Sequence, residues 1–503
     1  MKGLLKIAFR NLFEHRAKSI IVGVLLSLGV VILILGSAMH NGMARGIEQS
    51  FTKNYTADII ITGIAEGPVS LFGVSSAGGT AKTPVLPEYE KILTTAMTLK
   101  HVVGITGMAN TFGIVQKDAV GQEINPQTAE DDKEGTRNQF RFFFLFGVDT
   151  FQYKNVFPDF SMQAGSFLRP GERGIIINTK QKEGLEKYLK KSLQLGDELL
   201  IQGVSTGSLK IVRVPIVGIY EVKSEGYAPE QLAYCDIDTV RILDNMTLGA
   251  NIKVELSQEQ KAAFEVTNYD DLFSDSDTFI ASAASSGTID YENILGDISL
   301  REELNKVDTG AWHFILIRAE SPAHVSQIIK VLNTFFKENN IAAQAGNWKV
   351  AAGQYAQSVD VFGTVLLVGI IILAFVVVVI IMNTLVVSVI ERTTEIGTIR
   401  ALGASRGFVR QLFFSETLLL SLIFGSIGII LSYIANAVIH VLKIKASNQI
   451  LELLFGGQYL SPVITGGTVI AALAIIVLVG IAAHFYPVSV ALRIEPVRAI
   501  QTD

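Results

Sequence analysis

Residues 361–390 read VFGTVLLVGIIILAFVVVVIIMNTLVVSVI, a run without a single charged side chain. A helix that crosses a hydrocarbon core of about 30 Å needs about 20 apolar residues. This run is longer, which indicates either a tilted helix or a helix that continues past the bilayer as a stalk. The run predicts a transmembrane helix, and therefore a membrane protein.

Three further apolar stretches meet the same criterion, at 19–40, 412–442 and 463–485. The first follows a basic tail, as a signal peptide does, but it exceeds the core of about 7–15 residues and no Ala-x-Ala cleavage site follows it. We expect it to remain as an anchor, which gives four transmembrane helices. Charged residues make up 18% of the chain and the mean hydropathy is +0.40, whereas soluble domains carry about 25% charged residues.

Basic residues near the ends of these runs predict the orientation. They lie in the N-terminal tail, in the loop at 391–411 and in the tail at 486–503. These three segments should be cytoplasmic, which places 41–360 and the short loop at 443–462 outside. The net charge of −5 gives no indication of a nucleic-acid partner.

The N-terminal tail, 1–18, has an apolar face that includes Leu5, Phe9 and Leu12, and a basic face that includes Lys6 and Arg10. This pattern predicts an amphipathic helix at the inner surface of the membrane. The alternative is a plain cytosolic extension of the first span.

The segment at 41–360 is too long for a loop and must fold as one domain or two. Strand–helix–strand patterns at 57–116 and 311–346 predict two βαβ halves that pair into a membrane-proximal α+β subdomain. Between them, 117–310 reads as an inserted β-rich subdomain, with strands at 140–148, 174–177, 198–203, 209–220 and 231–236. The stretches at 63–83 and 116–138 read as loops.

Two common motifs for chemistry are missing from the sequence. It contains no G-x-x-x-x-G-K-[ST] and no H-E-x-x-H. Cys235 is the single cysteine, which excludes an intrachain disulfide and a thiolate metal cluster. We therefore expect no enzyme, no cofactor and no metal site in this chain.

The loop between the second and third runs reads ERTTEIGTIRALGASRGFVRQ, residues 391–411. It predicts a short helix, a break at Gly403 in a left-handed conformation, and a second helix capped by Ser405 that enters the third span. Ile396, Ile399 and Leu402 would form an apolar ridge. Such a rigid turn could pass force from a cytosolic motor to a transmembrane helix, although an ordinary interhelical hairpin fits the same residues.

Residues 395–404, EIGTIRALGA, resemble the signature of FtsX/MacB-type ABC transporter permeases. The resemblance continues through residues 411–413 (QLF), Gly425 and Gly428, and the C-terminal residues 486–488 and 494–500 resemble the closing motif of the family. The order of parts also agrees, with one span, a large outer domain and three more spans. The residues that the resemblance assigns to contact with an ATPase are Glu395, Ile396, Gly397, Ile399, Arg400, Ala401, Leu402, Gly403 and Ala404.

The resemblance implies a permease in the bacterial inner membrane, with both termini cytoplasmic and an outer domain like the MacB periplasmic core. It implies a cytoplasmic ABC ATPase dimer that binds ATP and Mg²⁺, and a second permease that is either a copy or a paralogue. Glu416, an intramembrane carboxylate near the cytoplasmic end, is expected to have a structural role. Membrane lipids and a periplasmic chaperone or adaptor are further expected partners.

The element Asn41-Gly42-Met43 after the first span is similar to that of the lipoprotein-releasing LolC/LolE-type permeases. The first hypothesis is therefore the extraction of lipoproteins or other amphiphiles from the outer leaflet. The second is efflux of peptides or small hydrophobic molecules. The third is a relay that passes ATPase motion to an outer enzyme without transport.

Overall fold

The structure, a computed structural model, describes residues 7, 9–10, 16–76, 79–117, 139–158, 160–204, 210–221, 229–249, 303–391 and 393–493. The contacts divide these residues into two compact units. The helical unit comprises Met1–Lys53 and Ala352–Asp503, and the sheet unit comprises Asn54–Lys223 and Pro229–Ala351.

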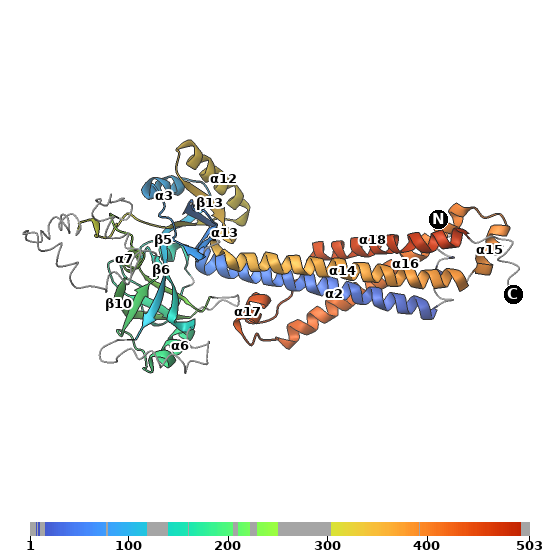
Figure 1. Ribbon diagram of the computed structural model, residues 1–503, viewed down its shortest axis with the longest axis horizontal. Helices are drawn as coiled ribbons and strands as arrows, with labels where there is room; N and C mark the ends of the chain where they lie inside the picture. The colour runs from blue at the N-terminus through green and yellow to red at the C-terminus, as the bar shows by residue number, and fades with distance from the viewer. Residues whose placement is uncertain are drawn as a thin grey trace, which may run out of the picture. The chain divides into compact units, whose positions relative to one another are not determined.

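Four long helices, drawn side by side in Figure 1, form the helical unit: α2 (Arg16–Phe51), α14 (Gln354–Glu391), α16 (Arg406–Leu442) and α18 (Gly466–Arg493). All four are long and apolar enough to cross a membrane, which confirms the expected number within the described residues. Their outward faces are apolar as well, for example at Ile371 and Phe375 of α14. A helix that is apolar all round suits an apolar surrounding.

Small side chains let α2 and α16 approach closely. The Ser27 hydroxyl donates to the Phe424 carbonyl at 2.8 Å. A Cβ at Gly428 would lie 2.6 Å from the Cβ of Val30 and 2.8 Å from the carbonyl oxygen of Ser27. Close backbone approach through small residues is a common means of packing helices in an apolar medium.

The helices extend past several expected boundaries. α2 continues to Phe51 because its buried positions Met43, Ile47 and Phe51 repeat every four residues and keep one face packed. α14 starts at Gln354 instead of 361, and α18 continues through Pro487 to Arg493 instead of ending at 485. The expected outer domain at 41–360 is thus shortened at both ends.

A ten-stranded sheet is the frame of the sheet unit, in the order β13-β1-β12-β5-β6-β11-β8-β10-β7, with β9 paired to β10 and β5. The strands are β1 (Ile59–Gly63), β5 (Val102–Gln116), β6 (Phe142–Val148), β7 (Ser161–Gly165), β8 (Ile175–Asn178), β9 (Glu198–Gly203), β10 (Ile211–Glu221), β11 (Leu232–Asp236), β12 (Phe314–Ala319) and β13 (Ala343–Asn347).

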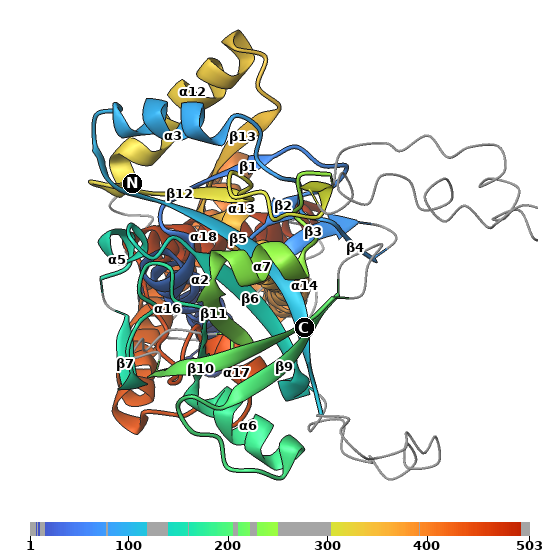
Figure 2. The same cartoon turned by 90° about the vertical axis from the view of Figure 1, so that its left-hand side faces the viewer.

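The two predicted βαβ halves interlock at one end of this sheet. α3 (Tyr89–Met97) and α12 (Pro322–Glu338) lie on the same side of the four strands β13-β1-β12-β5 (Figure 2). One core joins the helices to the strands through residues such as Ile92, Leu332, Ile59 and Ile317. Alternation along the strands and the apolar stripe of each helix explain why the sequence located these elements.

A second core lies beneath the other half of the sheet. α6 (Thr179–Leu189) and α7 (Ile237–Leu243) contribute Leu185, Val240 and Leu243 to it, and Cys235 is buried there as well. The predicted boundary at 117 is wrong, because β5 pairs with β12 along its first half and with β6 and β9 along its second. The expected inserted subdomain therefore shares one sheet with the α+β half.

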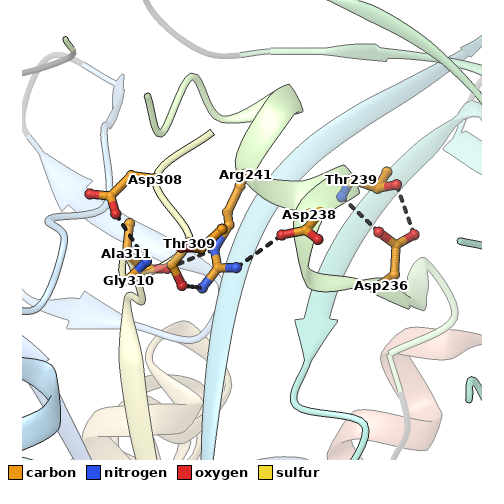
Figure 3. Close-up of polar contacts among 8 residues, drawn as sticks. All are labelled: Asp236, Asp238, Thr239, Arg241, Asp308, Thr309, Gly310 and Ala311. Carbon is orange, nitrogen blue, oxygen red and sulfur yellow. Dashed lines mark hydrogen bonds and ion pairs between the residues drawn. The ribbon is translucent and has the colours of Figure 1, made fainter. Parts of the chain in front are cut away.

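Arg241 holds the segment that leads into β12 (Figure 3). Its guanidinium is buried and donates to the carbonyls of Ala311 at 3.0 Å and Thr309 at 2.5 Å, and to the Asp238 carboxylate at 2.9 Å. The same group lies over the Trp312 ring. The buried charge of the guanidinium is tolerated because its N–H donors have hydrogen-bond acceptors.

Part of the expected loop at 63–83 is a small three-stranded sheet, formed by β2 (Val69–Ser70), β3 (Gly73–Ser76) and β4 (Gly79–Ala81). Gly73 makes the tight turn with a φ of 104°, a conformation that glycine adopts without strain. Most of the predicted loop at 116–138, from residue 118 on, and most of the predicted amphipathic helix at 1–18 lie outside the described residues.

Candidate functional site

The candidate site is the turn that joins α15 (Thr393–Ala401) to α16 in the helical unit. At the end of α15 the amide of Ala404 donates to the Ile399 carbonyl at 3.2 Å, and that of Gly403 to the Arg400 carbonyl at 3.1 Å. This pair of bonds is a Schellman motif, which needs a left-handed residue after the helix. Gly403 supplies it with a φ of 96°, as the sequence predicts.

The next helix starts after a turn of only four residues, 402–405. Ser405 is the N-cap of α16, and its hydroxyl accepts the amide of Phe408 at 3.2 Å. This is also the cap that the sequence predicts. Because both helix ends are satisfied by local bonds, the turn has a defined backbone shape.

A small apolar cluster holds the turn against the ends of the neighbouring helices. It contains Ile396 of α15, Val389 of α14, Val409 and Phe413 of α16, and Val488 of α18. The cluster explains why α18 continues through Pro487, since Val488 is buried on the far side of the proline. A displacement of α15 would therefore also displace the ends of α14, α16 and α18, which pack in the same cluster.

The predicted apolar ridge is divided in the structure. Ile396 is buried, Ile399 is half-buried, and Leu402 is 84% exposed. Residues three apart on an α-helix are offset by about 60° around the helix axis. A ridge made of three such residues therefore leaves the packed face along its length. One end of the ridge therefore anchors the turn, while the other presents a large apolar side chain to the surroundings.

The exposed surface of the turn includes Ala401, Leu402, Gly403, Arg406 and Arg410, and we call these five residues the coupling surface. Gly397 is buried within this chain, and its role at a contact with another protein stays a prediction. Arg400 and Ala404 are half-buried, and of Glu395 the structure describes only the backbone, in α15. The coupling surface combines the apolar side chain of Leu402 with small residues and two arginines. This combination suits docking to a protein with an acidic or apolar groove.

Glu416 lies on the buried face of α16 together with Leu412, Phe413 and Leu420, and is only 7% exposed. Its expected structural role stays a prediction. It lies away from the coupling surface, which is at the start of the helix.

The sequence analysis missed a contact between α2 and the loop at 443–462. That loop contains a helix, α17 (Gln449–Phe455), which ends at Gly456 with a φ of 72°. A Cβ at Gly46 would overlap the Gly456 carbonyl, and one at Gly42 would overlap that of Ser461. Two glycines four residues apart on one helix face were the signal that could have indicated this contact.

Asn41 reinforces the same contact. Its side-chain amide donates to the Thr468 hydroxyl at 3.1 Å and to the Val463 carbonyl at 3.3 Å, while the Val463 amide donates to the Ala38 carbonyl at 2.8 Å. The element 41–43, which the sequence analysis singled out, therefore fastens α2 to the start of α18.

The region that contains this turn is similar to a part of known proteins. Residues 367–496 match the family model of the FtsX-like permease C-terminal domain. The macrolide export ATP-binding/permease protein MacB of Bordetella avium is 36% identical over 123 residues, and that of Escherichia coli is 33% identical over the same length. These matches cover 24% of this chain and 17% of each relative, so the chain spans about a sixth of the length of the curated relatives it matches.

Two solved structures have a weak overall similarity to the chain. The extracellular domain of the transporter YknZ from Gram-positive bacteria is 12% identical with a TM-score of 0.27, and the match covers 58% of this chain and 100% of the YknZ chain. The periplasmic region of MacB from Actinobacillus actinomycetemcomitans is 10% identical with a TM-score of 0.28, and the match covers 60% of this chain and 91% of the MacB chain.

Residues 367–496, which contain the capped turn and parts of the long apolar helices, therefore form an FtsX-like permease C-terminal domain, and this part of the chain is similar to export ATP-binding/permease proteins.

Proposed function

We propose that this chain is the membrane subunit of an ABC transporter and transmits ATP-driven motion of a separate ATPase to its sheet unit. The four long helices cross the bacterial inner membrane, with both termini in the cytoplasm and the sheet unit outside. ATP and Mg²⁺ bind to the ATPase dimer, and a second permease, a copy or a paralogue, completes the complex.

The observation that carries this proposal is the exposure of Leu402 on a turn whose backbone is otherwise fixed. A side chain of this kind gains roughly 1.5–3 kcal/mol when it is fully buried, so an exposed leucine at a rigid turn favours a partner. Arg406 and Arg410 beside it would steer an acidic partner surface to the turn. The family match covers this part of the chain.

The helices connected to the turn have the length that transmission requires. α14 has 38 residues and α16 has 37, which at about 1.5 Å per residue gives roughly 55 Å each. Both exceed the hydrocarbon thickness of about 30 Å. A movement imposed at α15 would therefore be carried across the membrane by continuous, hydrogen-bonded helices.

For the substrate we propose lipoproteins or other amphiphiles of the outer leaflet. The support is the Asn41-Gly42-Met43 element, which resembles that of lipoprotein-releasing permeases. An alternative is efflux of hydrophobic small molecules or peptides, favoured by the names of the matched relatives, among them the macrolide export proteins. In that case the same coupling surface would serve a different cargo.

The coupling proposal is tested with Leu402→Glu in the full-length chain, with Ile450→Glu as the matched control. Ile450 is also a strongly exposed apolar residue, 71% against 84%, but it lies in α17 on the loop predicted to be outside. We expect Leu402→Glu to reduce the ABC ATPase that co-purifies with the chain at least tenfold, and Ile450→Glu to leave it unchanged. Equal ATPase recovery with both variants would refute the coupling surface.

The substrate proposal is tested by depleting the protein and fractionating lipoproteins between the two membranes. Lipoproteins should accumulate in the inner membrane if they are the cargo. An unchanged distribution, together with increased sensitivity to hydrophobic drugs, would support efflux instead.

A further inference from the structure

Three ligand-type side chains from distant parts of the sequence meet at the edge of the sheet unit. His101 precedes β5, Glu320 follows β12, and His324 lies in the first turn of α12. The backbone brings them together, since β5 and β12 are paired up to Val102 and Ala319 and the Glu320 amide donates to the His101 carbonyl at 2.9 Å. His101 itself has a φ of 66°, which turns its side chain at the start of the strand.

The potential ligand atoms of the three side chains all lie within 4.8 Å of one another. Nδ1 of His101 is 2.6 Å from Oε2 of Glu320, and the two imidazole rings stack with centroids 3.8 Å apart. The side chain of His101 is 40% exposed and that of Glu320 is 61% exposed, so both can be reached from solvent. The hydrogen bond from His101 lowers the pKa of the Glu320 carboxyl, which keeps it in the ionised form that binds cations.

His324 lies in the first turn of α12, and an imidazole is a common ligand of transition metal ions. Ser321 caps the same helix end and fixes the turn from which His324 projects. Two histidines and one carboxylate are a ligand set typical of Zn²⁺ and neighbouring transition ions, rather than of Mg²⁺ or Ca²⁺.

We propose that His101, Glu320 and His324 form a binding site for a divalent transition metal ion such as Zn²⁺. The ion takes the place of the hydrogen between Nδ1 of His101 and the Glu320 carboxylate, and the neutral imidazole of His101 then carries its one proton on Nε2. His324 turns out of the ring stack so that one nitrogen of each imidazole faces the ion, and water completes a tetrahedral set. Bound metal would fasten α12 to the start of β5. This reverses the expectation, drawn from sequence spacing alone, that the chain has no metal site.

The test is isothermal titration of the full-length, chelator-treated protein in detergent with ZnCl₂, and separately with MgCl₂. We expect one Zn²⁺ per chain with a micromolar or lower Kd, a rise in Tm with Zn²⁺, and no binding of Mg²⁺ at the same concentrations. Co²⁺ in place of Zn²⁺ should give the visible absorption bands of a tetrahedral site.

Conservative variants keep the test free of folding artefacts. His101→Asn retains a residue that tolerates positive φ, and His324→Gln retains a good residue for the first helical turn. Each should weaken Zn²⁺ binding by at least about 10–100-fold, the range seen when an outer-shell partner of a metal ligand is lost, because a direct ligand contributes more. Glu320→Gln should do the same, whereas Glu338→Gln, at the other end of α12, should not. Wild-type affinity in the double variant His101→Asn/His324→Gln, or a wild-type Kd above 1 mM (~4 kcal/mol of binding), would overturn the proposal.

Discussion

Nε2 of His313 lies 3.5 Å from Oδ2 of Asp244, and both side chains are buried in the sheet unit. Nδ1 of His313 is 2.9 Å from the Asn110 side-chain oxygen, and the Thr111 hydroxyl donates to the other oxygen of Asp244 at 3.2 Å. These residues come from β5, from the end of α7 and from the approach to β12. The network therefore ties the two halves of the sheet together where the long strand β5 passes between them.

Asp244→Asn should lower the free energy of unfolding by about 1–3 kcal/mol, because a buried partner of His313 and Thr111 loses its charge and part of its bonding capacity. The measurement is urea unfolding of the full-length protein followed by tryptophan fluorescence. A double-mutant cycle with Thr111→Val isolates the contribution of the pair. A coupling energy of zero would show that the two residues act independently.

Gly428→Leu should weaken the packing of α16 against α2, because even a Cβ at this position meets Val30 and the Ser27 backbone. We expect a Tm several degrees lower in detergent and reduced recovery of folded protein. Gly369→Leu is the control, since a Cβ at Gly369 has no atom within 4 Å. Equal loss of stability in both variants would contradict the close approach of the two helices.

Gly403→Val should disrupt the turn at the coupling surface without steric overlap, because Gly403 has open space around it but a φ of 96°. The strain is roughly 1–3 kcal/mol for a β-branched residue. We expect ATPase activity stimulated by the assembled complex to fall strongly, while membrane insertion is retained. Gly403→Asn, which tolerates positive φ better, should keep most of the activity. If the valine variant is as active as the asparagine variant, the shape of this turn does not matter for coupling.

Arg241→Lys should destabilise the sheet unit by about 1–3 kcal/mol. Lysine retains the charge but cannot reach Ala311, Thr309 and Asp238 at once, as the guanidinium fork does. Limited proteolysis of the full-length protein should show faster cleavage near residue 309. Arg169→Lys, at an exposed arginine, serves as the control and should leave the cleavage rate unchanged.

The long apolar runs and the strand patterns were readable from the sequence because each depends on local periodicity. Four helices, both βαβ halves and the caps at Gly403 and Ser405 follow from residues close together in the chain. The same local logic did not show that the helix of the first span continues to Phe51, where its packed face runs on through Met43 and Ile47.

Other features needed the tertiary structure, because they join residues far apart in the chain. Only the fold shows that β5 serves both halves of one sheet, that Ile396 is buried while Leu402 is exposed, and that Gly46 meets Gly456. His101 and Glu320 are 219 residues apart, and no spacing rule connects them. The sequence by itself determined which segments become helices and strands, through periodicity and capping. The tertiary structure decided which of their side chains meet, because strand pairing and helix packing set distances that sequence separation does not.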